Sequence, residues 1–292
     1  MALPLFRTAP LIAPKAPNLP LAPLAAYSSQ YQEQFNNVLR LYFNQLDNFN
    51  QLFTTNTGGA LLKFPNGAFH QDGATTLTAA MTNVSTTAIQ VTSTSLFASA
   101  GHLLIGTELV AYTGKTATTF TGITRGVYST TNVAHSIGDA VTEALGVASA
   151  TTSVAVPLDT TDVSNGVSID TVDNSKVVFD TAGYYNIQFS AQLLNFTTSD
   201  DNVTFWWKQN GTDIAYSAGI QAVPSKHGSS PGAAIVSWNI VLPIQADDYI
   251  QLYYASESGN TVLATYPAGT SPVHPISPSV ILTATFVSAL YT

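Results

Sequence analysis

One run of residues, 177–193, limits most strongly what this chain can fold into. From Tyr185 to Leu193 apolar side chains occupy every second position, and polar side chains occupy the positions between them. Successive side chains of a β-strand point to opposite faces, so a period of two indicates a strand with one buried face. The residues just before it, DTAG, predict a tight turn in which Gly183 can adopt a positive φ. We therefore expect a β-sandwich with this strand at its centre.

The same alternation recurs through the C-terminal part of the chain. It predicts strands at 167–172, 176–180, 184–195, 202–209, 212–217, 234–242, 248–255, 261–265 and 279–288. Asn210-Gly211 falls between two of them and is typical of a two-residue hairpin turn. Roughly eight or nine short strands in about 125 residues fit an antiparallel jelly roll or a related sandwich.

Composition excludes several classes of function. Charged residues make up 9% of the 292 residues, and the net charge is −8. Nine Lys and Arg residues cannot form the cationic stripe that nucleic-acid binding needs, so no nucleic-acid partner is expected. No run approaches the roughly 18 apolar residues that span a bilayer, so no membrane insertion is expected. Low charge with many Thr, Ser, Asn and Gln side chains favours surfaces buried against other protein chains.

Two segments without β character come first. Residues 1–26 contain six prolines among apolar side chains, which predicts an extended arm that anchors the chain on another protein, the alternative being a free terminus. Residues 27–53 contain no Gly or Pro and predict an amphipathic helix. Its apolar side chains are spaced 4-3-4-3-4, which indicates either a coiled-coil seam or one helix packed on its own domain. The seam would consist of Phe35, Leu39, Tyr42, Leu46, Phe49 and Phe53.

Residues 54–160 separate the helix from the predicted sandwich. Turn dipeptides dominate 54–74, which we expect to be a connector with a short hairpin at Asn66-Gly67. Short Thr- and Gly-rich segments over 75–160 predict a small β module. In a stretch so poor in charge, Glu108 and Arg125 are expected to form a structural ion pair, and His135 is expected to pack or cap and not to bind a metal.

Two resemblances rest on particular runs. Residues 95–141 resemble a small β module of several tailed-bacteriophage virion proteins. The matching positions are Gly101, Ile105, Gly106, Glu108, Tyr112, Thr113, Gly114, Thr121, Gly122, Arg125, Gly126, Thr130, His135, Gly138 and Val141. Residues 161–292 resemble the C1q and tumour-necrosis-factor jelly-roll superfamily, in the form found on phage fibres, through VFDTAGYYNIQFSAQ, WWKQNGTDIAYS, LPIQADDYIQLYY and PSVILTATFVSAL. The second resemblance implies a homotrimer with the C-terminal strand near its threefold axis.

Candidate contact residues follow from the strand pattern. Apolar side chains on the faces opposite the predicted core are typical interface anchors, and five fit a trimer contact: Tyr184, Trp206, Tyr253, Ile281 and Val287. In the long loops, the few side chains able to hold a ligand are His227, Tyr266 and His274. Asp200-Asp201-Asn202 is the best cation candidate, but it lacks a calcium-loop motif and is expected to be a solvated turn.

The order of these parts favours a non-enzymatic structural protein of a tailed-phage virion, assembled in the host cytoplasm. No catalytic motif is present, and no metal or cofactor is expected. In one hypothesis the chain is a homotrimeric fibre or spike, anchored on other virion proteins by residues 1–26, whose head binds a host-surface receptor or glycan. In the other it is a capsid decoration or cement protein, or a head fibre. An envelope-polysaccharide depolymerase is a third hypothesis, because phage spikes are often enzymes.

Overall fold

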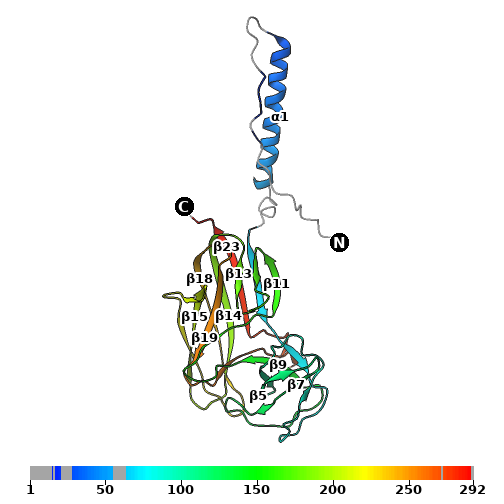
Figure 1. Ribbon diagram of the computed structural model, residues 1–292, viewed down its shortest axis with the longest axis vertical. Coiled ribbons are helices and arrows are strands. Elements are labelled where there is room, and N and C mark those ends of the chain that lie inside the picture. Colours follow the sequence, from blue (N-terminus) through cyan, green and yellow to red (C-terminus); the bar gives the residue numbers. More distant parts are fainter. Residues whose placement is uncertain (1–14, 16, 21–27, 55–63, 271, 291–292) are drawn as a thin grey trace. The chain divides into compact units, whose positions relative to one another are not determined.

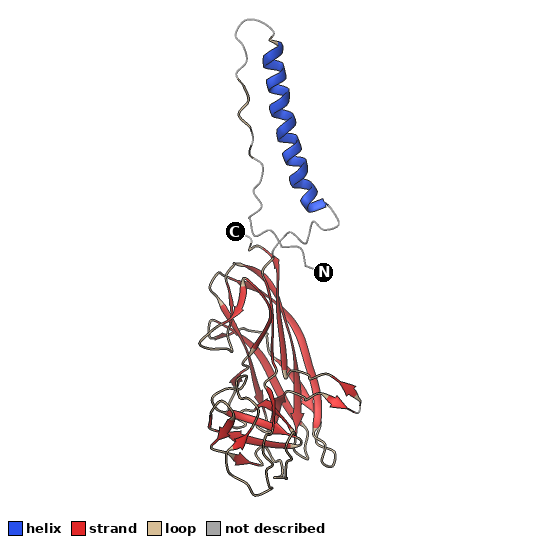
Figure 2. Cartoon of the chain, turned by 90° about the vertical axis from the view of Figure 1, so that its right-hand side faces the viewer, coloured by secondary structure: helices blue, strands red, loops and turns tan. Residues whose placement is uncertain are grey.

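The computed structural model describes residues 15, 17–20, 28–54, 64–270 and 272–290, with the side chains of 52–54 left out. The chain divides into two compact units, Met1–Phe64 and Pro65–Thr292. The first contains a single described helix, α1 (Ser29–Thr54), and the second contains the strands (Figures 1 and 2). Most of the predicted arm, 1–26, lies outside the described residues, so its docking stays a prediction.

Helix α1 confirms the helix predicted at 27–53. Its first turn is capped by Ser28, whose Oγ accepts the backbone N–H of Tyr31 at 3.2 Å. Along one face the predicted seam residues Phe35, Leu39, Tyr42, Leu46 and Phe49 are partly buried. Leu41 and Phe43, which are not part of the seam, are each 59% exposed. The side chain of Phe53 lies outside the described set, and a coiled coil stays a prediction.

The second unit is built from antiparallel strands, which confirms a mainly β fold. The first sheet runs β11 (Thr160–Asn165), β1 (Asn66–Gln71), β23 (Val280–Ser288), β14 (Gly183–Asn195), β20 (Thr261–Ala264), β9 (Ala140–Leu145), β4 (Gly101–Ile105), β5 (Glu108–Tyr112) and β8 (Thr124–Arg125). In addition, β18 (Gly232–Ile244) pairs with β14, and β2 (Ala74–Thr76) pairs with β9. The first sheet thus continues from the long strands into the small ones.

A second sheet faces the long strands of the first. It runs β12 (Val167–Ile169), β13 (Val177–Phe179), β19 (Tyr249–Ser256), β15 (Asp201–Gln209) and β16 (Thr212–Asp213), with β10 (Val154–Ala155) on β19 and β17 (Gly219–Val223) on β15. Two small sheets consist of β3 (Ile89–Gln90), β7 (Thr119–Thr121) and β6 (Gly114–Lys115), and of β21 (Gly269–Thr270) and β22 (Val273–His274). We call the two-sheet body the sandwich.

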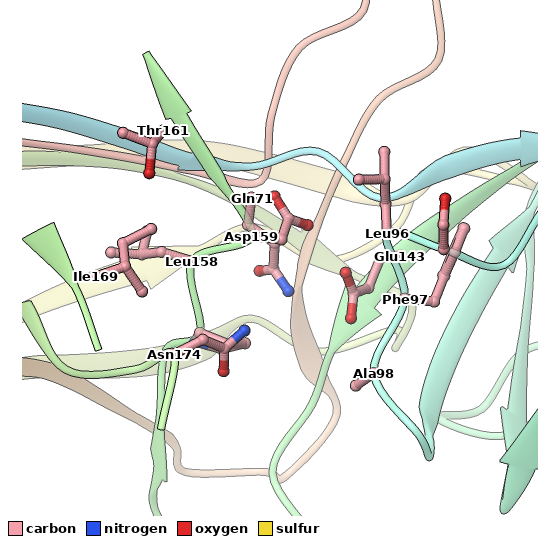
Figure 3. A pocket seen from close by; sticks show the side chains of 12 residues that line it. Gln71, Leu96, Phe97, Ala98, Glu143, Leu158, Asp159, Thr161, Ile169 and Asn174 are labelled. Atoms are coloured by element: carbon pink, nitrogen blue, oxygen red, sulfur yellow. The ribbon is translucent and has the colours of Figure 1, made fainter. Parts of the chain in front are cut away.

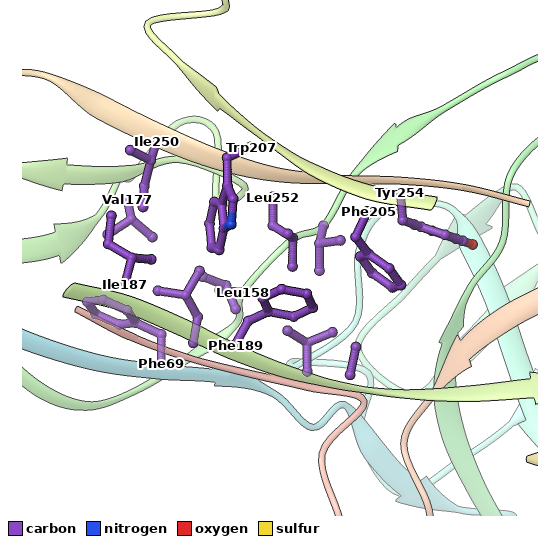
Figure 4. Packing of buried hydrophobic residues seen from close by; sticks show 14 of the residues in the cluster. Phe69, Leu158, Val177, Ile187, Phe189, Phe205, Trp207, Ile250, Leu252 and Tyr254 are labelled. Carbon is purple, nitrogen blue, oxygen red and sulfur yellow. The ribbon is translucent and has the colours of Figure 1, made fainter. Parts of the chain in front are cut away.

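The larger core lies between the two sheets of the sandwich. The alternate side chains of β14 that the sequence assigned to the core, Tyr185, Ile187, Phe189, Ala191 and Leu193, are at most 3% exposed. They pack against side chains of the second sheet, including Phe205 and Trp207 (Figure 4). The ring of Phe189 lies 5.4 Å from that of Phe205 and 5.7 Å from that of Trp207. The strand predicted as central therefore contributes one face to this core.

The prediction of a connector with a short hairpin at Asn66-Gly67 is wrong, because residues 66–71 form strand β1. Asn66-Gly67 does not turn the chain but begins β1, which pairs antiparallel with β11 and at its end with β23. Phe69 in this strand is fully buried in the larger core. The partners in β11 lie 90 or more residues further along the chain, so tertiary contacts overrode the local turn signal of Asn66-Gly67.

The small β module is inserted into the sandwich and does not precede it. Strands β2 to β9, residues 74–145, follow β1 and come before β10 and β11. This inserted module has its own core, which includes Leu77, Phe97, Leu103, Tyr112 and Phe120. Strand β9 pairs with β4 of the module and with β20 of the sandwich. The structure therefore replaces the predicted series of 75–160 and 161–292 with a nested arrangement at one end of the sandwich (Figure 1).

Two predicted turns have different outcomes. Asn210 and Gly211 have φ values of 51° and 80°, as the predicted hairpin turn requires. Gly183, by contrast, is the first residue of β14 and does not have a positive φ. A Cβ at this position would come within 2.3 Å of the ring of Phe286. Glycine is needed there for space and not for a turn.

The nested arrangement predicts where the chain can be shortened. A chain that begins at Pro65 keeps the whole second unit, and we expect it to unfold cooperatively. A chain that begins at Ser164 loses β1 and the inserted module, and with them the buried Phe69, Val156 and Leu158. Losing one buried Phe side chain alone costs about 3–5 kcal/mol, comparable with the roughly 5–15 kcal/mol that stabilises a domain. Thermal unfolding followed by circular dichroism should show no cooperative transition for the shorter chain, and equal melting temperatures would contradict the arrangement.

Candidate functional site

Glu108, Arg125 and His135 form a buried cluster in the inserted module. The Glu108 carboxylate accepts hydrogen bonds from Arg125 Nε and Nη2 at 2.5 and 2.6 Å, and it lies 2.9 Å from His135 Nε2. The backbone N–H of Val133 donates a further bond to it at 3.0 Å. Exposure of the three side chains is 0, 2 and 4%. The ion pair expected from the sequence is present, and His135 joins it.

This cluster holds the surrounding loops through hydrogen bonds to their backbone. The Arg125 guanidinium also donates to the carbonyl oxygens of Thr82, Ser85 and Val133. Burial alone raises the pKa of Glu108, but the hydrogen bonds from Arg125, Val133 and His135 outweigh it and lower that pKa below its ordinary value. A carboxylate that is charged and fully bonded in this way stabilises two loops and is a poor proton donor.

Asp201, from the run considered as a cation site, makes hydrogen bonds within the sandwich. Asp201 is 4% exposed, and its carboxylate accepts bonds from the hydroxyls of Ser256 and Thr261 and from the backbone N–H of Ser258. Burial raises the pKa of Asp201, but these bonds together lower it below its usual range. The prediction of a solvated turn is thus wrong for Asp201. Among the described residues, no group of three or more His, Cys, Asp or Glu side chains is placed to hold a metal ion.

The five residues predicted for one trimer contact lie on two opposite faces. Tyr184, Ile281 and Val287 belong to β14 and β23 and point outward from the first sheet, because their neighbours Tyr185, Leu282 and Phe286 point into the core. Trp206 and Tyr253 belong to β15 and β19 and point outward from the second sheet, as their neighbours Trp207 and Tyr254 are buried. A strand pattern does not show in which sheet a strand lies, so the two sets could not be separated from the sequence. One planar contact cannot contain all five.

The outer faces of the two sheets differ in charge. Strands β14, β18 and β23 contain no charged residue, and they expose the aliphatic side chains of Ile235, Val241, Ile281 and Val287 by 41–69%. On the second sheet, the rings of Trp206 and Tyr253 lie 5.7 Å apart. Lys208 lies over the Tyr253 ring at 4.4 Å and 3.3 Å from Asp213, which also accepts the indole N–H of Trp206. The part of the first face formed by β14, β18 and β23 therefore has no charge to desolvate, whereas on the second face Asp213 already binds Lys208 and Trp206.

Of the loop residues expected to face a ligand, two come together. Tyr266 and His274 line a hollow of about 400 Å³ that also includes Gln192 and Ile235 of the first sheet. His227 does not reach it; its backbone pairs with Ser230 in a separate turn. The hollow is thus continuous with the uncharged outer face and is not an isolated loop site.

A cavity that the sequence did not suggest lies where the inserted module meets the sandwich. It has a volume of about 350 Å³ and is lined by residues of both parts, among them Gln71, Leu96, Ala98, Glu143, Leu158 and Asp159 (Figure 3). Burial, and then the charge of Asp159, raises the pKa of Glu143 to about 7. Burial also raises the pKa of Asp159. The one sequence signal was a carboxylate within the otherwise uncharged strand AVTEAL.

Comparison with known proteins adds no family. No protein-family model matches the chain, and no curated protein is significantly similar to it. In the part of the chain that the structure describes, no helix is both long enough and apolar enough to cross a membrane.

The buried cluster of the module gives a stability prediction. We expect Glu108→Gln to lower the free energy of unfolding by about 3–5 kcal/mol, because it leaves the Arg125 guanidinium buried without its counter-charge. Lys176→Gln is the matched control, since Lys176 pairs with Asp173 at the surface, where such pairs contribute little. Denaturant unfolding of both variants measures the difference. Equal effects would show that the buried cluster is not a main support of the module.

Proposed function

We propose that this chain is a structural protein of a tailed-phage virion that acts by self-association and binding, not by catalysis. The observation that carries the proposal is the outer face of the first sheet, where β14, β18 and β23 present aliphatic side chains and no charge. Burying such a face against another copy removes apolar area from water without desolvating an ion. The virion context of the proposal rests on the sequence resemblance of residues 95–141 and 161–292 to phage virion domains.

The path of the chain supports a jelly roll of the C1q and tumour-necrosis-factor type. Successive strands alternate between the sheets: β13, β14 and β15 lie in the second, first and second sheet, and β17, β18 and β19 repeat that order. In the proposed homotrimer, β23 lies near the threefold axis. Tyr184, Ile281 and Val287 then belong to the trimer contact, whereas Trp206 and Tyr253 lie outside it.

Helix α1 supplies a second place for self-association. Its seam residues Phe35, Leu39, Tyr42, Leu46 and Phe49 share one face. Phe43, next to this face, remains 59% exposed in a single chain, and a helix bundle would cover it. We propose that three copies of α1 pack together in the trimer, and that the arm before it contacts other virion proteins.

The position on the particle distinguishes two forms of the proposal. A fibre or spike would be present in few copies and would bind a host-surface receptor or glycan. A decoration or cement protein, or a head fibre, would be present in far more copies on the capsid. Quantitative mass spectrometry of purified particles, calibrated on the major capsid protein, separates the two, and absence from the particle would contradict both. For the fibre form, purified full-length protein should compete with particles for adsorption to host cells.

The proposed contact face can be tested by a charge substitution. We expect the full-length chain to be a trimer and Ile281→Asp to raise its dissociation constant at least about ten-fold, because a carboxylate would be buried at the contact. Ile220→Asp is the control, since Ile220 is 69% exposed on β17 of the second sheet. Sedimentation equilibrium of the three proteins measures the effect. A monomeric parent chain, or the same dissociation constant for both variants, would rule out this face.

A further inference from the structure

The cavity between the inserted module and the sandwich contains two acidic side chains that no part of the proposed virion role uses. Glu143 lies on β9, and Asp159 precedes β11. We propose that Glu143 and Asp159 form a proton-dependent contact that holds the inserted module against the sandwich when Glu143 is protonated and loosens it when both are charged. This inference does not depend on the virion role.

The position of Glu143 connects the two parts directly. Its residue is 7% exposed, and it lines the cavity together with Gln71 of β1 and Ala98 of the module. Its backbone N–H donates to the Gly73 carbonyl oxygen at 2.7 Å. Asp159 lines the same cavity from the sandwich side (Figure 3). A change of charge on Glu143 therefore acts on contacts from both parts.

The charged and titratable groups around this pair do not neutralise it. Asp159 accepts the backbone N–H of Asp72, and the Asp72 side chain lies 3.3 Å from His70 Nε2. The Lys115 ammonium is held by the carbonyl oxygens of Thr94 and Phe97. Tyr112, which also faces Glu143, donates its hydroxyl to Ala98 O. Among the residues that the structure describes, no cation forms an ion pair with Glu143 or Asp159.

The direction of the pH effect follows from the proton balance. Burial and then Asp159 raise the pKa of Glu143 to about 7, against an ordinary value of about 4.3 in an unfolded chain. Between these values the folded chain retains a proton that the unfolded chain has released. Stability therefore falls as pH rises from about 4.3 to about 7 and levels off above that. The module loop that contains Leu96 and Ala98 should open first, since it carries one wall of the cavity.

The test compares the full-length chain with two substituted chains at pH 5 and pH 8. We expect the parent to melt several degrees lower at pH 8 and to exchange its 95–98 amides faster there, after correction for the intrinsic rate. Glu143→Gln should remove most of the pH dependence of both quantities, because its amide cannot ionise. Asp162→Asn, which changes an acid that contacts His70 outside the cavity, should keep the parent's profile. The proposal would be overturned if the melting temperature of the parent did not fall between pH 5 and pH 8. It would also be overturned if the melting temperature of the Glu143→Gln chain fell as much as that of the parent.

A second substitution keeps the test decisive if Glu143→Gln does not fold. Asp159→Asn removes the neighbouring negative charge but leaves Glu143 ionisable. We expect the midpoint of the pH-dependent change to move to lower pH in this chain, because a like charge no longer disfavours ionised Glu143. An unchanged midpoint would show that the two carboxyl groups do not interact.

Discussion

The packing of β14 between its neighbours is the interaction on which the second unit depends. All thirteen residues of this strand pair with β18, and its other edge pairs with β23 and then β20. One face contributes alternate side chains to the larger core, and the opposite face is the centre of the uncharged outer surface. Because β20 in turn pairs with β9, the same hydrogen-bonded sheet also carries the inserted module. Strand β14 thus contributes to the larger core, to the attachment of the inserted module and to the uncharged outer face.

A few of the charged groups of the chain are buried inside it. Glu108 and Arg125 neutralise each other in the module, and Asp201 is held by hydroxyl and backbone donors in the sandwich. Each group is fully bonded, as buried charges must be. Glu143 differs, because it is buried in a cavity that it shares with a second carboxyl group, and no cation of the described residues forms an ion pair with it. Hydrogen-bonded charges stabilise loops at any physiological pH. Glu143 and Asp159, in contrast, make the contact between the inserted module and the sandwich depend on pH.

The outer faces of the two sheets differ in how readily they can bind another chain. The first sheet presents Ile281 and Val287 among uncharged polar side chains, so association there costs little desolvation. On the second sheet, Trp206 is bonded to Asp213, and Lys208 covers the ring of Tyr253. Those aromatic rings already have partners within the chain. Both faces carry apolar side chains, so hydrophobicity alone does not identify the contact face. What distinguishes the first sheet is that its strands β14, β18 and β23 contain no charged residue.

The sequence by itself determined the elements whose signals are local. The alternation at 185–193 placed β14 and its buried face, Asn210-Gly211 placed a hairpin turn, and the absence of Gly and Pro placed α1. Only the tertiary structure decided what depends on distant partners: that residues 66–71 are a sandwich strand, that the module is inserted, and that Trp206 and Ile281 lie on opposite faces. That Glu143 and Asp159 line the same cavity also belongs to this second group. A period of two shows that side chains alternate, but the sheet in which a strand lies depends on residues far away in the chain.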